Sequence, residues 1–143
     1  APQTIARLMN MGIAPYNITS SVTLVIAQRL ARRLCPHCKR KMRLPDHALV
    51  AEGFSEAEVH AGFDVYEAVG CEECTEGYKG RTGIYQVMPM SEEIAAVVLA
   101  GGNAMEIARI AQEQGIRDLR ASALLKVKEG VTSLAEINRV TKD

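Results

Sequence analysis

The chain has 143 residues, of which 48% are hydrophobic, 4% are aromatic and none is Trp, and its 17 basic and 17 acidic residues balance. Balanced charge argues against a general nucleic-acid binder. No apolar run approaches the roughly 20 residues of a membrane-spanning helix, and Ala1–Leu8 lack the layout of a signal peptide. We therefore expect one domain of ordinary size, or a small domain with an appendage, in the cytoplasm.

The N-terminal residues predict a short helix. One face of this helix carries three apolar side chains, Ile5, Leu8 and Met9, and the helix is expected to stop at Gly12. The helix has no start signal beyond Pro2. For this reason we expect the chain to be a piece cut from a longer protein.

A second helix and a strand are expected before the first cysteine. Asn17–Ala27 is predicted to be helical, and three residues could serve as its N-cap: Asn17, Thr19 and Ser20. Gln28–Leu34 is predicted to be a short strand.

The stretch between the two cysteine pairs predicts structure of its own. Pro45–Ala51 and Ser55–Ala61 are expected to be short helices. Ser55 and Glu58 have the spacing of a capping box, in which the serine caps the first turn and the glutamate bonds back. Asp64–Val69 is expected to be a strand that leads into the second pair.

A turn and a returning strand follow the second pair. Glycines at both ends of Gly77–Gly80 permit a tight reversal of the chain. Thr82–Met88 then reads as a strand that ends at Pro89.

The last third of the chain predicts a compact set of short helices. They are expected over Glu92–Ala100, over Ala104–Gln114, around Leu119, Leu124, Leu125 and Val127 up to Gly130, and over Ala135–Val140. Ser91 and Asn103 are placed to cap the first two. Ser133 and Glu136 are placed to form a capping box for the last one.

Four cysteines, Cys35, Cys38, Cys71 and Cys74, form two Cys-x-x-Cys pairs separated by 32 residues. Each pair can direct two sulfurs to one point, and two pairs complete a tetrahedron of thiolates around Zn²⁺. Because all four positions are cysteine, no position is left for a reactive water. The sequence thus predicts one structural zinc ion rather than a catalytic one.

Two other uses of the cysteines fit the sequence less well than zinc binding. Disulfides suit small secreted proteins, and no export signal is visible here. Thioredoxin-like redox chemistry would require a βαβ pattern around the pair. The three histidines, His37, His47 and His60, are expected to be solvated or packed side chains rather than ligands.

Charge is distributed unevenly around the cysteines. Seven cations crowd the first pair: Arg29, Arg32, Arg33, Lys39, Arg40, Lys41 and Arg43. Residues 46–76 carry nine acidic residues and no Lys or Arg. One interpretation is that the cations offset the negative charge of a tetrathiolate site and otherwise lie on a solvated strand face. The other is that they form a basic surface for phosphate, acidic partners or anionic lipid.

Three separated stretches resemble the GspE/PulE family of secretion ATPases. They are 27–38 (AQRLARRLCPHC), 70–85 (GCEECTEGYKGRTGIY) and 130–143 (GVTSLAEINRVTKD). The tetracysteine pattern disfavours the retraction enzymes of this superfamily. The ending NRVTKD at 138–143 and Glu52-Gly53-Phe54 look more like the type IV pilus extension branch than the type II secretion branch.

The resemblance implies a mostly helical α+β fold, which contains the last part of a RecA-like ATPase domain. Residues 1–34 would end that domain, 35–80 would form the zinc insertion, 81–90 the returning strand, and 91–143 a C-terminal helical bundle. No phosphate loop of the G-x-x-x-x-G-K-[ST] type is present, and the family's ATP and Mg²⁺ sites are expected to precede residue 1. The chain alone should not hydrolyse ATP.

The resemblance also implies partners. The parent protein would be a homo-hexamer at the cytoplasmic face of a bacterial inner membrane, with the platform protein of the pilus machine and a PilZ-type regulatory protein as partners. Three arginines, Arg29, Arg33 and Arg81, are candidates to approach a nucleotide at a subunit boundary. Truncation is expected to expose four apolar residues: Ile5, Leu8, Val22 and Val25.

An alternative hypothesis from another functional class is a free-standing zinc ribbon that binds nucleic acid. Its basic run would contact phosphates. Balanced charge and the scarcity of aromatic stacking residues weigh against it.

Overall fold

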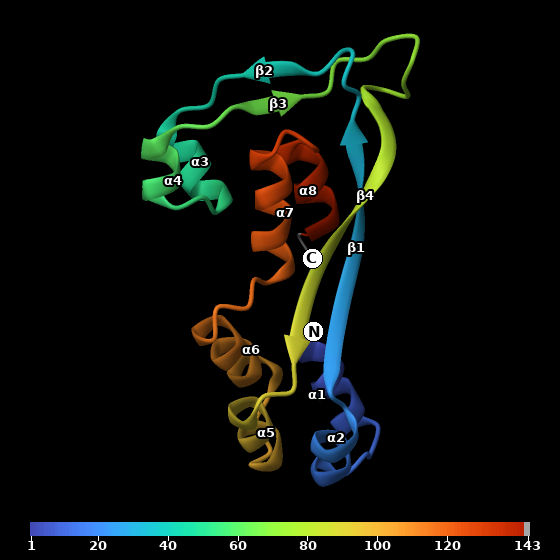
Figure 1. The fold of residues 1–143 in the computed structure, drawn as a ribbon, viewed down its shortest axis with the longest axis vertical. Coiled ribbons are helices and arrows are strands. Elements are labelled where there is room, and N and C mark those ends of the chain that lie inside the picture. Colours follow the sequence, from blue (N-terminus) through green and yellow to red (C-terminus); the bar gives the residue numbers. More distant parts are fainter. Residues whose placement is uncertain (142–143) are drawn as a thin grey trace. The chain divides into compact units, whose positions relative to one another are not determined.

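The computed structural model describes residues 1–141, and it divides into two compact units that are described separately below (Figure 1). Unit 1 comprises Ala1–Ala27 and Tyr85–Asp118. Unit 2 comprises Gln28–Ile84 and, of the described residues, 119–141.

Unit 1 is formed by four short helices and the outer parts of two strands. The helices are α1 (Pro2–Asn10), α2 (Pro15–Ser21), α5 (Glu92–Leu99) and α6 (Ala104–Glu113). Helix α1 packs on α6, while α5 packs on both α2 and α6. The side chains of Ser91 and Asn103 accept hydrogen bonds from the third residues of α5 and α6, which confirms both predicted N-caps.

The core of unit 1 is built without aromatic residues. Its buried members are Ala1, Ile5, Ile18, Val25, Met88, Ile94, Val98, Ile107 and Ala111. Ile5 is fully buried and Val25 is 8% exposed, while Leu8 and Val22 pack partly buried against the same core. The expectation that these four residues are exposed is therefore wrong, because α6, α5 and their neighbours supply the apolar surface that covers them.

The predicted second helix is wrong in its extent and in its cap. Helix α2 ends at Ser21, and strand β1 (Leu24–Leu34) begins where the helix was expected to continue. Ala14 is the N-cap residue, with Pro15 at the first position, and no side chain caps this helix. β-Branched Val and Ile favour extended backbone, and the run Val22–Ile26 supplies several of them.

Strand β1 pairs with β4 (Tyr78–Pro89) in a two-stranded sheet, and Figure 1 draws the two arrows in opposite directions. Both strands contribute residues to each unit. In β4 burial alternates strictly from Thr82 to Met88, with even-numbered side chains inside. This is the period-2 pattern of a strand with one solvated face.

Unit 2 contains the cysteines, a small two-stranded sheet and four helices. Strands β2 (Arg40–Met42) and β3 (Val65–Glu67) pair antiparallel, with Lys41 opposite Tyr66. The sequence indicated β3 but not β2, which consists of only three residues, two of them basic. Helices α3 (Asp46–Glu52) and α4 (Glu56–Ala61) follow β2, and both parts of the Ser55–Glu58 capping box are formed, as predicted.

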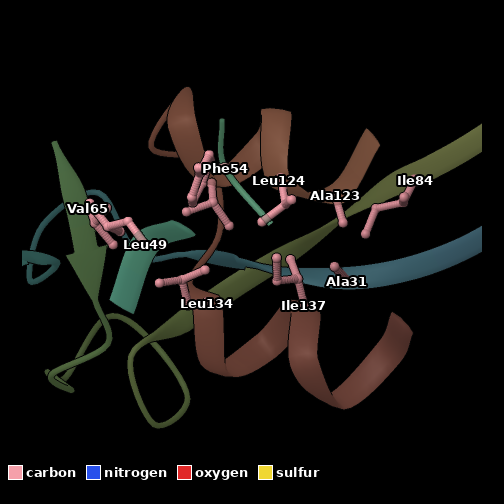
Figure 2. Close-up of a cluster of buried hydrophobic side chains, with 10 residues drawn as sticks. Ala31, Leu49, Phe54, Val65, Ile84, Ala123, Leu124, Leu134 and Ile137 are labelled. Carbon is pink, nitrogen blue, oxygen red and sulfur yellow. The ribbon is translucent and has the colours of Figure 1, made fainter. Parts of the chain in front are cut away.

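Helices α7 (Leu119–Lys128) and α8 (Leu134–Thr141) complete unit 2 and pack on each other and on β3. Figure 2 shows the buried side chains that these elements share with β1, β3, β4 and the α3–α4 segment. They are Ala31, Leu49, Phe54, Val65, Ile84, Ala123, Leu124, Val127, Leu134 and Ile137.

Arg120 fastens three segments of unit 2 together. Its guanidinium donates to the Glu52 carbonyl at 2.8 Å, to the Glu52 carboxylate at 2.7 Å and to Asn138 Oδ1 at 2.7 Å. The C-terminal end of α3 is thereby joined to α7 and α8 by charge-assisted hydrogen bonds.

The architecture is a mixture of eight helices and four strands within residues 1–141. Contacts group α7 and α8 with the cysteine region, and α5 and α6 with the N-terminal helices. The division into 1–34, 35–80, 81–90 and 91–143 refers to the parts of a longer ATPase, and it remains a prediction.

Candidate metal centre

The first cysteine pair lies where β1 ends. The N–H of Cys35 donates to the Gly77 carbonyl at 2.9 Å, and the Cys35 carbonyl accepts the Lys39 N–H at 3.0 Å. The second of these bonds closes the tight turn that carries Cys38. Cys35 is fully buried, so its sulfur lies inside unit 2.

The second pair lies on the turn that precedes β4. The Cys74 N–H bonds to the Cys71 carbonyl at 3.4 Å, and Thr75 pairs with Tyr78 across the following turn. Glu76 and Gly77 have φ values of 54° and 92°, which is the left-handed conformation that glycine adopts without penalty. A Cβ on Gly77 would lie 2.5 Å from the Cβ of Ala68, so glycine is required here for space as well.

These two turns bring the four sulfurs together. All four Sγ atoms lie within 4.8 Å of one another. The separations are 3.8 Å for Cys35–Cys71, 3.7 Å for Cys38–Cys74 and 3.5 Å for Cys71–Cys74. A tetrahedron with Zn–S bonds of about 2.3 Å has sulfurs about 3.8 Å apart, so the arrangement fits a tetrathiolate metal site.

The same geometry bears on the disulfide alternative. All four cysteines are free, and a disulfide would require sulfurs only about 2.05 Å apart. Backbone N–H groups point at the sulfurs: Gly70 N–H donates to Cys38 Sγ at 3.4 Å, and Cys71 N–H donates to Cys74 Sγ at 3.3 Å. Such donors stabilise negative charge on sulfur, which a metal-bound thiolate carries.

The thiols differ in their pKa values. Burial alone would raise the pKa of Cys74, but the N–H of Cys71 and the neighbouring thiols lower it to about 7. The N–H of Glu73 acts to lower the pKa of Cys71, yet hydrogen bonding with Cys74, together with burial, raises it to about 12. Adjacent thiolates repel each other, and a bound cation is what would allow all four to be deprotonated.

The turn between α7 and α8 is hydrogen-bonded to residues next to the two cysteine pairs. The N–H of Leu34 donates to the Val131 carbonyl at 2.8 Å, and Lys39 Nζ donates to the Gly130 carbonyl at 3.1 Å. The hydroxyl of Tyr78 is 2.6 Å from Ser133 Oγ. The four cysteines and the last two helices are therefore parts of one packed unit.

A buried ion network lies beside this contact and was not foreseen from the sequence. The carboxylate of Glu136 is fully buried and accepts from Arg32 at 2.9 Å and from Arg139 at 2.8 Å. It also accepts the backbone N–H of Arg32 at 2.7 Å. Burial alone would raise the pKa of Glu136, but these donors outweigh it and lower the pKa to about 2.

This network corrects the predicted second capping box. Ser133 Oγ does accept the Glu136 N–H at 3.1 Å. The Glu136 side chain, however, is engaged by the two arginines rather than by the Ser133 backbone. The guanidinium of Arg32 also lies over the Tyr78 ring, 4.2 Å from its centroid, in a cation–π contact. Its buried Nε atom has no hydrogen-bond partner within residues 1–141.

Several cations near the first pair are engaged by other partners. Arg40 bonds to Glu67 across the β2–β3 strand pair, and Lys41 lies 3.3 Å from Asp64. Lys39 lies over the Tyr66 ring at 4.5 Å. These contacts favour structural roles for the cations over a free basic face.

The remaining candidate residues lie at the surface. Arg29, Arg33 and Arg81 are exposed on β1 and β4, and their proposed approach to a nucleotide remains a prediction. His37 is 2.9 Å from Glu73, so it spans the two cysteine turns without joining the sulfur cluster. His47 and His60 line a groove between α3 and α4.

No helix in the described part of the chain is long and apolar enough to cross a bilayer. Residues 1–139 match the protein family described as "Type II/IV secretion system protein".

Relatives of this chain carry related names. It is 52% identical over its whole length to "Type IV pilus assembly ATPase PilB" of Acinetobacter baylyi and 48% identical over its whole length to the protein of the same name in Pseudomonas aeruginosa, and it covers 25% of each of them. It is 36% identical, over 97% of its length, to "Type II secretion system protein E" of Dickeya dadantii, of which it covers 27%. The chain thus spans about a quarter of the length of each of these three relatives.

Proposed function

Because the chain belongs to the type II/IV secretion system protein family, we propose that it forms the C-terminal region of a hexameric ATPase that powers type IV pilus polymerisation. The observation that carries this proposal is the graded similarity to named relatives. Identity is 52% and 48% to two pilus assembly ATPases and 36% to a type II secretion protein. The equivalent region of a type II secretion ATPase is the alternative.

Zn²⁺ held by Cys35, Cys38, Cys71 and Cys74 is proposed to stabilise this region. With four thiolates as ligands the ion has no open coordination position, so its contribution is structural. It joins the end of β1 to the turn before β4, and through the α7–α8 turn it supports the last two helices.

The ATPase activity belongs to the longer protein in this proposal. ATP and Mg²⁺ would be bound by residues outside this chain, since it contains no phosphate loop. Arg29, Arg33 and Arg81 remain candidates to approach a nucleotide across a subunit boundary. The isolated chain is expected to show no ATP hydrolysis.

One surface of unit 1 is suited to pack against the rest of the ATPase. Leu24 and Ile26 on β1, with Tyr85 and Val87 on β4, are between 46% and 56% exposed. A two-stranded sheet is only marginally stable by itself, and an apolar outer face favours a covering layer. We propose that this strip faces the nucleotide-binding part of the same polypeptide.

The other partners are proposed from the family. The region would take part in subunit contacts of the hexamer and in docking of the inner-membrane platform protein or a PilZ-type regulatory protein. The full protein would then act at the cytoplasmic face of the inner membrane of a bacterium.

A chimera tests the proposal. Residues 1–143 would replace the matching quarter of the Acinetobacter baylyi pilus assembly ATPase, and the chimera would be expressed in cells that lack that ATPase. We expect pili to be restored, whereas the same chimera with Cys71→Ser should restore fewer because unit 2 is destabilised.

A reciprocal chimera in the Dickeya dadantii type II secretion protein separates the two branches. Restored secretion there, combined with a pilus chimera that folds and hydrolyses ATP but forms no pili, would contradict the pilus assignment. Measuring hexamer formation and ATP hydrolysis of each chimera distinguishes loss of function from loss of folding.

A further inference from the structure

The segment between β2 and β3 contains a surface groove that the metal centre does not explain. Helices α3 and α4 lie side by side (Figure 1). A groove of about 420 Å³ opens along them. Its lining residues are Asp46, His47, Val50, Glu56, Val59 and His60.

The floor of the groove is apolar although it is open to solvent. Val50 is 39% exposed, and Val59 is only partly buried against the core of unit 2. The other large apolar residues of this segment are used internally, since Leu49 and Phe54 are 8% and 3% exposed. Val50 and Val59 are therefore available to receive apolar side chains from another molecule.

The acidic charge of this region is only partly neutralised within the chain. Residues 46–76 carry nine acidic residues and no Lys or Arg. Five of these carboxylates have a cationic or histidine partner: Glu52, Glu58, Asp64, Glu67 and Glu73.

The carboxylates of Asp46, Glu56, Glu72 and Glu76 lie outside every ion pair of the described residues, and the first two line the groove. Asp46 and Glu56 occupy the first turns of α3 and α4, where negative charge complements the helix dipole. That position explains the sign of the two charges but leaves the open apolar floor between them unexplained.

We propose that this groove, which we call the α3–α4 groove, binds a basic amphipathic helix of another protein. One or two large aliphatic side chains of the partner would contact Val50 and Val59, and Lys or Arg side chains beside them would pair with Asp46 and Glu56. Apolar anchors in a short groove, flanked by complementary charge, are the usual basis of helix recognition. The proposal does not depend on the pilus assignment, because it rests on residues of unit 2 alone.

A model peptide tests the proposal on the intact 143-residue chain. The probe is a labelled peptide of about 15 residues, long enough to form some helix, with Leu at i, i+3, i+4 and i+7 and Lys on the opposite face. Fluorescence anisotropy measures its affinity, and amide NMR shifts locate its site. We expect saturable binding with shifts confined to α3 and α4.

Matched variants separate the groove from general attraction between opposite charges. Val50→Ser and Glu56→Gln should each weaken binding by about three- to tenfold, which corresponds to one lost apolar or charged contact. Two controls should leave affinity unchanged: Met105→Ser, which removes an exposed apolar side chain on α6, and Glu72→Gln, which removes another carboxylate without an ion-pair partner.

Three results would overturn the proposal. One is the absence of saturable binding up to about 1 mM peptide, where affinity is too weak for a specific site. Another is equal weakening by Glu72→Gln and Glu56→Gln. The third is equal binding of a peptide of the same composition whose leucines are scrambled.

Discussion

Glu136 is the residue whose environment differs most from that of an ordinary surface carboxylate. It is fully buried on α8, yet two guanidinium groups and a backbone N–H bond to its oxygens. Arg32 and Arg139 keep 40% and 58% of their side chains exposed, so they remain solvated while they pair with it. The desolvation cost therefore falls mainly on one ion and is offset by several charge-assisted bonds.

Replacing Glu136 with Gln should destabilise unit 2. The amide keeps the shape of the carboxylate but loses the charge, so we expect a loss of about 1.5–3 kcal/mol, the range for hydrogen bonds to charged groups. Urea unfolding followed by circular dichroism measures it. Glu129→Gln, at an exposed position directly after α7, is the control and should change stability little.

The same carboxylate predicts a pH dependence. Its pKa is about 2 in the folded chain against an ordinary value of 4.5, so the folded state binds its proton more weakly than the unfolded state does. Its contribution is fully present above the ordinary value and is lost as the pH falls toward the folded value. The difference in urea midpoint between the native chain and Glu136→Gln should shrink on going from pH 7 to pH 3; a constant difference would refute the assignment.

At the scale of elements, the turn through Gly77 positions the second cysteine pair. Gly62 and Gly77 both have a positive φ, 87° and 92°, but a Cβ at Gly62 would meet nothing within 4 Å. The two glycines therefore separate the cost of a positive φ from the cost of a clash.

Gly77→Ala should cost more than Gly62→Ala. Both substitutions place a side chain on a residue with a positive φ, which is unfavourable. Only Gly77→Ala also forces a methyl group against Ala68 and Val69. We expect an additional loss of about 1–3 kcal/mol, the usual cost of overpacking, and weaker zinc retention in a chelator competition. Equal effects of the two substitutions would show that Gly77 is needed only for its conformation.

Most helices could be predicted from local signals. Ser55, Ser91 and Asn103 each cap the helix predicted to follow them, because a cap acts within its own first turn. The helix predicted over Asn17–Ala27 was too long, because the β-branched residues after Ser21 favour a strand. Strand β2 was missed because its pairing with β3 joins residues far apart in sequence, and a three-residue segment carries no periodicity of its own.

The candidate site was predictable only in part for the same reason. Cysteine spacing is a local signal and indicated the four sulfurs that the structure brings together. The Arg32–Glu136–Arg139 network joins residues 104 positions apart and the Arg120 contacts join residues 68 apart, so only the folded chain reveals them. The α3–α4 groove depends in the same way on how two short helices pack.

At the scale of the whole molecule, the chain consists of two compact units, and only unit 2 contains the cysteines. A structural zinc site can contribute roughly 10–16 kcal/mol to folding, comparable with the roughly 5–15 kcal/mol total stability of a domain. Loss of the metal should therefore act on one unit far more than on the other.

Cys71→Ser should reduce hydrogen-exchange protection in β2, β3, α7 and α8 while α1, α2, α5 and α6 stay protected. Helices α7 and α8 are included because the turn between them bonds to the cysteine turns. Hydrogen exchange with mass spectrometry resolves the two groups of peptides. Equal loss of protection in both units would contradict the division.

The central claim is that the four cysteines hold one structural zinc ion. Its most direct test is the metal content of freshly purified, reduced chain, measured by inductively coupled plasma mass spectrometry. We predict about one zinc per chain, as a single tetrathiolate site requires, and a marked loss of zinc in Cys71→Ser. A folded, reduced chain that contains no zinc and takes up none when it is supplied would contradict the claim.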